Sequence, residues 1–107
     1  MTDAVVVLIT AAKEDDAAAI ANALVEGRLA GCVNIIRQIR SIYRWQGKLE
    51  DEQEVLMIVK SKRELFSDLD KKVREIHPYA VPEIIALPII DGFEGYLGWL
   101  SEETGKE

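Results

Sequence analysis

The segment from His77 to Ile84 places two prolines four residues apart, between a helical pattern and an apolar run. Each proline fixes its own φ and keeps the preceding residue out of helical geometry. We therefore expect a helix to end at His77 and the chain to be extended by Glu83. A segment this stiff can hold the imidazole of His77, the phenol of Tyr79 and the carboxylate of Glu83 in a fixed arrangement. The same features suit a rigid helix-to-strand connection without further role, so both interpretations stay open on local grounds.

Size and charge limit what the remaining patterns can mean. A chain of 107 residues that is 49% hydrophobic predicts one domain over residues 1–107 with a modest core, for which help from a partner chain would be useful. Nineteen acids against thirteen Lys plus Arg give a net charge of −6, which disfavours nucleic acid and anionic membrane surfaces as partners.

The first residues and the cysteine usage bear on location. The apolar run over residues 4–9 follows no basic segment or cleavage pattern and is too short to span a bilayer, so we expect a mature chain free of the membrane. Cys32 is the only cysteine and cannot form an internal disulfide. A cytoplasmic location is the resulting expectation.

The first third of the chain predicts a strand followed by a helix. Residues 5–9 are nearly all β-branched and do not alternate with polar residues, which is typical of a strand buried on both faces in the middle of a sheet. Acidic residues from Glu14 then favour a helix N-terminus, and apolar residues follow at helical spacing until the helix ends near Gly31. Lys13 stands at the N-cap, where serine or aspartate would cap better.

The middle of the chain predicts a tall hairpin. Residues 32–48 and 53–60 read as its two strands, and the basic interruption at 37–40 predicts a bulge or bend in the first of them. By strand parity, Tyr43 and Trp45 share a face with Val33 and the other residues of that parity.

The last third predicts a helix, a strand and a further short helix. Ser61 and Glu64 have the spacing of a capping box, which would open a helix that runs to His77. Residues 83–90 form an apolar strand whose proline indicates an edge position or a strand end. Residues 91–103 carry a helical stripe weakened by two glycines, and residues 105–107 should fray.

The order of these elements is strand, helix, strand, strand, helix, strand, with a short C-terminal helix. A βαββαβ chain most naturally forms an antiparallel sheet covered on one face by two helices. We therefore predict an α+β fold of the ferredoxin-like sandwich type with a long hairpin. The outer hairpin carries Tyr43, Trp45 and Leu49, which is more apolar surface than a monomer of this size easily covers.

Four segments of the chain, taken in order and at these separations, resemble the CutA family of divalent-cation tolerance proteins, and the resemblance spans nearly the whole chain. These segments are Arg28-Leu29-Ala30-Gly31-Cys32-Val33-Asn34-Ile35, Ser41-Ile42-Tyr43-Arg44-Trp45-Gln46-Gly47-Lys48, His77-Pro78-Tyr79-Ala80-Val81-Pro82-Glu83-Ile84 and Tyr96-Leu97-Gly98-Trp99-Leu100.

The resemblance implies a ferredoxin-like subunit, a tight homotrimer similar in plan to PII signalling proteins, a cytoplasmic location, and a link to tolerance of copper and other divalent cations. It implies no known reaction. Some relatives carry a cysteine on the first strand as a suspected copper ligand, and Ile9 fills that position here.

The metal chemistry available to one chain is sparse. The candidate ligands are His77, Cys32 and Glu83, and they are not clustered at the spacing of a metal motif. A cysteine such as Cys32, at the start of a strand, is usually a small buried hydrophobe rather than a ligand. We expect no required cofactor, and weak binding of Cu(II) or another divalent cation at His77. The acidic run from Glu50 to Glu54 could hold hard cations loosely or simply be a solvated hairpin end.

A second hypothesis is a small-molecule sensing trimer with a ligand cleft between subunits. An amphipathic mixture typical of ligand pockets would line that cleft, namely Tyr43, Trp45, Lys60, Tyr79 and Glu83. In this arrangement the Lys60 ammonium would meet an anionic or small polar ligand, although Lys60 and Glu83 could equally form an ordinary surface ion pair.

Two other classes of function are disfavoured. The serines have no histidine neighbour and the chain has no Gly-rich phosphate loop, so we do not expect an enzyme. An RNA-recognition domain would need an aromatic platform on strand residues 5–9 and 55–59 and a basic surface, and both are missing from the sequence.

Overall fold

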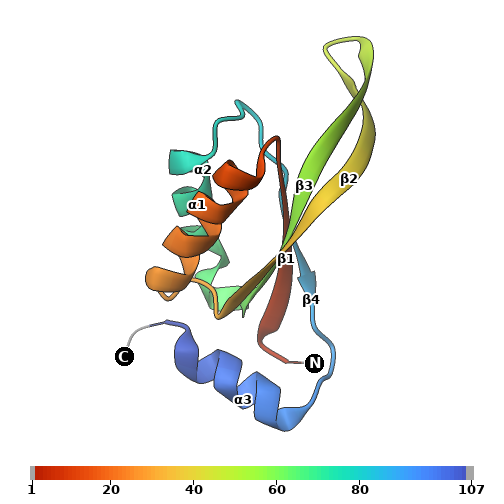
Figure 1. Ribbon diagram of the computed structural model, residues 1–107. Helices are drawn as coiled ribbons and strands as arrows, with labels where there is room; N and C mark the ends of the chain where they lie inside the picture. The colour runs from red at the N-terminus through yellow and green to blue at the C-terminus, as the bar shows by residue number, and fades with distance from the viewer. Residues whose placement is uncertain (1, 106–107) are drawn as a thin grey trace.

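The computed structural model describes residues 2–105. Helices α1 and α2 lie together on one face of an antiparallel sheet, and α3 lies at one end of it (Figure 1). The strands follow the order β2-β3-β1-β4, which confirms the predicted α+β fold of ferredoxin-like arrangement. The elements are β1 (Ala4–Ala11), α1 (Glu14–Glu26), β2 (Cys32–Trp45), β3 (Lys48–Lys62), the 3-10 helix η1 (Arg63–Leu65), α2 (Phe66–Ile76), β4 (Ile84–Pro88) and α3 (Glu94–Glu103).

The hydrophobic core lies between the sheet and helices α1 and α2. Strand β1 pairs with β3 on one side and with β4 on the other, so the unbroken apolar run is central, as predicted. Its alternate residues Val7 and Ile9 point into the core and are fully buried, as are Ile20 and Leu24 of α1 and Leu69 of α2.

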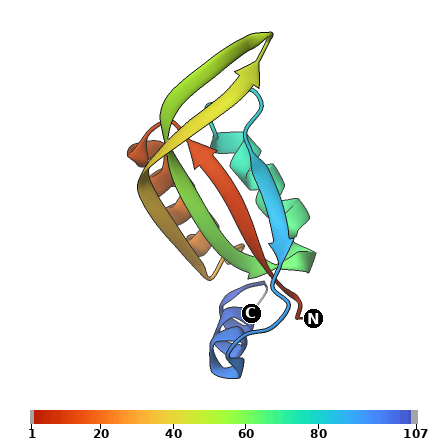
Figure 2. The ribbon, with the colours of Figure 1, turned by 90° about the vertical axis from the view of Figure 1, so that its right-hand side faces the viewer.

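The opposite side of the sheet, which we call the open face, carries no helix among residues 2–105 (Figure 2). Strand alternation places Val6 and Leu8 of β1 there, and both are only half-buried. Ile36, Ile85 and Leu87 share this face and remain 42%, 50% and 48% exposed. One side of the sheet is therefore apolar and uncovered within a single chain.

Strands β2 and β3 extend as a tall hairpin beyond the rest of the sheet (Figure 1). The turn consists of Gln46 and Gly47, both with positive φ, 49° and 80°, which is the geometry of a tight two-residue hairpin turn. The predicted bulge is confirmed, because the β2–β3 register shifts between Ile36 and Ile39.

The bulge corrects the predicted faces of the outer hairpin. Before it, Val33 pairs with the core residue Val59, so Val33 faces the helices. After it, Tyr43 pairs with Glu50, and alternation along β3 places Glu50 on the open face. Tyr43 and Trp45 therefore do not share a face with Val33, because one extra residue in β2 reverses the alternation.

Several predicted ends of elements are corrected. The capping box does not form: Ser61 belongs to β3, where its hydroxyl donates to the Leu29 carbonyl oxygen at 2.6 Å, and α2 begins only at Phe66 after a 3-10 turn. Helix α1 ends at Glu26 rather than near Gly31. The fourth strand and last helix are shorter than predicted, and the proline at the end of the edge strand β4 agrees with its predicted place.

The C-terminal region is held against the turn that follows α1. The Arg28 guanidinium donates to the carbonyl oxygens of Glu102 and Gly105 at 2.7 and 2.8 Å, and the Gly105 amide donates to the Arg28 carbonyl at 2.8 Å. Gly105 is thus anchored instead of frayed, whereas the fraying predicted for 106–107 concerns residues outside the described range. No helix within residues 2–105 is both long and apolar enough to cross a membrane.

Candidate functional site

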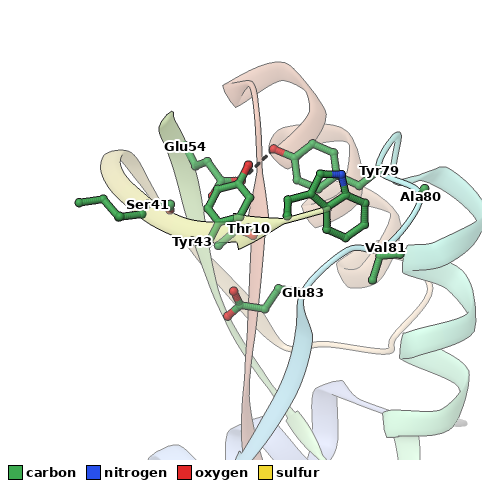
Figure 3. A pocket seen from close by; sticks show the side chains of 10 residues that line it. Thr10, Ser41, Tyr43, Glu54, Tyr79, Ala80, Val81 and Glu83 are labelled. Carbon is green, nitrogen blue, oxygen red and sulfur yellow. Dashed lines mark hydrogen bonds between the residues drawn. The ribbon is translucent and has the colours of Figure 1, made fainter. Parts of the chain in front are cut away.

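A cavity of about 680 Å³ opens on the open face, where the outer hairpin and the end of β1 meet the proline-braced segment before β4 (Figure 3). This volume lies within the usual range of small-molecule sites. Its lining combines aromatic, hydroxyl and carboxylate side chains from three strands and one loop: Thr10, Ser41, Ile42, Tyr43, Trp45, Glu54, Tyr79, Ala80, Val81 and Glu83.

A hydrogen bond joins two residues that line the cavity, Tyr79 and Glu54. The Tyr79 hydroxyl donates to a Glu54 carboxylate oxygen at 2.8 Å (Figure 3), and Glu54 is only 7% exposed. Burial raises the pKa of Tyr79 above its ordinary value, and the hydrogen bond to Glu54 and the negative charge of that carboxylate raise it further. The phenol is therefore a neutral hydrogen-bond donor throughout the physiological range.

His77 links Tyr79 to strand β1 through hydrogen bonds of its ring. Its Nδ1 accepts a hydrogen bond from the Tyr79 amide at 3.1 Å, and its Nε2 lies 2.7 Å from the Thr10 carbonyl oxygen. An amide can only donate and a carbonyl can only accept, so the ring is the neutral tautomer with hydrogen on Nε2. Thr10 lies one residue beyond the last β1–β4 pair, Ile9 with Ile84, so the imidazole contacts β1 just beyond the point where β4 begins.

The outer hairpin contributes a negatively charged aromatic wall. Partial desolvation raises the pKa of Tyr43, and the charges of Glu52, Glu54 and Glu50 on the same face raise it further. The Tyr43 hydroxyl also donates weakly to Glu52 at 3.4 Å. The acidic run is thus divided between two faces, because Asp51 points the other way and pairs with Arg40 at 2.6 Å.

The structure brings four of the five predicted cleft residues to this cavity: Tyr43, Trp45, Tyr79 and Glu83 all line it. Lys60 does not. It lies six residues from Glu54 along β3, about 20 Å away at the usual rise of a strand, and its ammonium contacts the side chain of Asn34. Within one chain the expected grouping of Lys60 with Tyr79 and Glu83 is therefore wrong. Lys60 pairs with Val6 of β1, whereas Glu83 precedes Ile84, which pairs with Ile9 at the other end of β1.

Comparison with known proteins places the chain in a family. The model of the family described as CutA1 divalent ion tolerance protein matches residues 5–103. The chain belongs to the CutA1 family. The divalent-cation tolerance protein CutA of Thermus thermophilus is 54% identical over 94% of this chain and 97% of its own length.

Solved structures of CutA1 proteins share the fold of this one closely. A Thermus thermophilus divalent cation tolerance protein superimposes with a TM-score of 0.93 at 53% identity, over 95% of this chain and 99% of that one. A CutA described as periplasmic, from Archaeoglobus fulgidus, gives 0.91 at 39% identity over 94% and 97%. Protein CutA of Mus musculus is 49% identical over 90% of this chain, which covers 54% of that longer protein.

The metal ligands proposed for this CutA1 chain do not gather within one protomer. Cys32 starts β2 opposite Lys60, at the far end of the sheet from the cavity, and His77 uses both ring nitrogens in hydrogen bonds. Glu83 lines the cavity. Among residues 2–105, no three His, Cys, Asp or Glu side chains are grouped so that they could hold a metal ion.

Sequence reasoning missed three polar members of the cavity, Thr10, Ser41 and Glu54. A signal existed for Glu54, since it is the last acid before the five apolar residues 55–59 of β3. An acid at such a border is either exposed or held by a partner, and the partner, Tyr79, is 25 residues away in sequence.

Proposed function

We propose that this CutA1 chain acts in divalent-cation tolerance as a homotrimer. The observation that supports the assembly is the open face. Its exposed residues Ile36, Ile85 and Leu87 form an apolar surface that no helix among residues 2–105 covers. The outer hairpin continues this surface with Trp45, which is 41% exposed. Burial of one such indole is worth about 2–3 kcal/mol, and symmetry would repeat each contact three times.

Sedimentation velocity at micromolar concentration tests the assembly. We expect a species of about three times the 12.0 kDa chain mass, and a species of 12.0 kDa would contradict the proposal. Trp45→Ala should shift the distribution toward smaller species more than Lys72→Ala, which changes a charged residue on the outer surface of α2.

Metal binding in this proposal is weak. Coordination by His77 requires its Nδ1 to give up the Tyr79 amide, and one imidazole with carboxylates is a poor ligand set for Cu(II) or Zn(II). We expect micromolar or weaker affinity by isothermal titration of the wild type. Equal affinity in His77→Ala would remove His77 as a ligand, and nanomolar affinity in the wild type would mean that the assembled subunits build a better site.

A second candidate function is small-molecule sensing, and the cavity is the specific observation that favours it. Four aromatic or acidic residues chosen from the sequence line one cavity of ligand size, beside an open face that a neighbouring subunit would border. Native mass spectrometry of the protein as purified, with metal analysis of the same sample, separates the candidates. A bound organic mass supports sensing, and bound metal alone supports the tolerance role.

Catalysis is not part of the proposal, and the Thermus thermophilus relative is named a divalent-cation tolerance protein. We propose a cytoplasmic location for this chain. Relatives differ in this respect, since the Archaeoglobus fulgidus protein is described as periplasmic and an Arabidopsis thaliana relative as chloroplastic. Cell fractionation with detection of the untagged protein tests the location.

A further inference from the structure

We propose that the cavity binds an organic cation, a protonated amine carried on an apolar or aromatic body. This inference rests on the second candidate function, in which the cavity is a ligand site, and it names the chemical class of that ligand. It departs from the anionic or small polar ligand expected from the sequence, because that expectation depended on Lys60.

The first supporting observation is the state of Glu54. Its carboxylate is nearly buried, accepts one hydrogen bond from the neutral Tyr79 hydroxyl, and takes part in none of the ion pairs found among residues 2–105. A buried charge is costly unless an opposite charge or several hydrogen bonds compensate it. A bound ammonium group would supply the missing charge.

The second observation is the sign of the surrounding charge. None of the described residues that line the cavity is Lys, Arg or His, whereas Glu54 and Glu83 both line it. Glu50 and Glu52 add negative charge near Tyr43 on the same wall. A partly enclosed site with acids and no bases raises the local concentration of cations and repels anions.

The third observation is the aromatic content of the walls. Tyr43 and Trp45 come from the outer hairpin and Tyr79 from the proline-braced segment, so aromatic rings enter the cavity from two separate parts of the fold. Faces of Trp and Tyr attract ammonium groups through the ring quadrupole, most strongly where water is excluded. These rings also provide the apolar surface that the body of an amine would cover.

The same features argue against the other cations and anions. Hard divalent ions prefer six or more oxygen ligands, and the only carboxylates that line the cavity among the described residues are those of Glu54 and Glu83. Nucleotides and other phosphates need backbone amides or basic side chains, and the lining has no base to offer. An organic monocation matches both the charge and the surface.

The test uses three probes of the same shape and different charge, titrated by calorimetry into the full-length protein in its native assembly at neutral pH. Benzylammonium is the cation, benzyl alcohol the neutral analogue and benzoate the anion. We expect benzylammonium to bind about tenfold or more tightly than benzyl alcohol, the effect of one compensated charge in a partly screened site. Benzoate should not bind measurably.

Two variants locate the binding. Glu83→Gln removes a carboxylate from an exposed lining residue without disturbing the core, and we expect it to weaken benzylammonium binding about fivefold or more while leaving benzyl alcohol unchanged. Glu75→Gln makes the same charge change on the exposed side of α2 and should leave both affinities as in the wild type. If both variants weaken benzylammonium binding equally, the preference for the cation comes from the net charge of the protein and not from the cavity, and the inference is overturned.

The outcomes separate the inference from the function on which it rests. Equal or tighter binding of benzyl alcohol or benzoate would overturn the cation preference but keep the cavity as a ligand site. If none of the three probes binds, the inference is refuted, as would happen if a basic side chain of a neighbouring subunit already neutralised Glu54. The sensing function is then decided separately by the bound mass found in native mass spectrometry.

Discussion

Replacement of His77 by leucine tests whether the buried imidazole is a structural bridge. The ring joins the end of β1 to the proline-braced segment through the Thr10 carbonyl at 2.7 Å and the Tyr79 amide at 3.1 Å. His77 is 6% exposed, so water reaches it poorly. Leucine keeps most of the side-chain volume and removes both hydrogen bonds. The contribution of the hydrogen bonds is thereby separated from the cost of the empty space that a smaller side chain would leave.

The magnitude follows from what the substitution leaves unpaired. A buried polar group that loses its partner costs about 1–3 kcal/mol, and Thr10, at 8% exposure, should show most of this cost. The Tyr79 amide belongs to a half-buried residue and can recover part of its loss from water. With a small gain from the added apolar surface, we expect the free energy of unfolding to fall by about 2 kcal/mol.

Urea unfolding followed by far-UV circular dichroism measures this change, with every protein at the same subunit concentration because assembly contributes to stability. Val81→Ala is the matched control, since Val81 lies in the same segment and is 67% exposed, and it should change stability by less than about 0.5 kcal/mol. If His77→Leu unfolds at the same urea concentration as the wild type, the two hydrogen bonds of His77 do not contribute to stability, and its interpretation as a structural bridge is wrong.

Two further predictions concern the sheet and the cavity. Ser61→Ala removes the 2.6 Å hydrogen bond from a fully buried hydroxyl to the Leu29 carbonyl and should lower the free energy of unfolding by about 1–2 kcal/mol, measured by urea unfolding. Tyr79 has a folded pKa above its unfolded value near 10, so its contribution to stability is complete below about pH 10 and is lost as pH rises further. Thermal unfolding between pH 8 and 11 should therefore show a steeper alkaline decline for wild type than for Tyr79→Phe, and parallel declines would contradict this assignment.

The order and identity of the strands and helices could be predicted because they depend on local patterns. The unbroken β-branched run identified β1 as central, and the prolines at 78 and 82 located the end of α2 and the entry to β4. Element ends were less predictable, because alternatives of similar local free energy compete there. Ser61 shows this: its hydroxyl could cap a helix, but it donates instead to the Leu29 carbonyl, in the turn between α1 and β2.

The candidate site was predictable only in part. Tyr79 and Glu83 could be placed together because a stiff segment carries both, and Tyr43 and Trp45 because they share the hairpin. Glu54 could not be found, because its partner lies 25 residues away and only the folded chain brings them together.

By itself, the sequence determined the α+β architecture, the central strand, the rigid segment and an excess of apolar surface, since each depends on periodicity or on the stereochemistry of proline. Only the tertiary structure decided which side chains meet. One bulge residue between Ile36 and Ile39 turns Tyr43 onto the open face, and the pairing of β4 with β1 leaves Lys60 far from Glu83. Both outcomes depend on strand register, and a shift of one residue reverses every side chain beyond it.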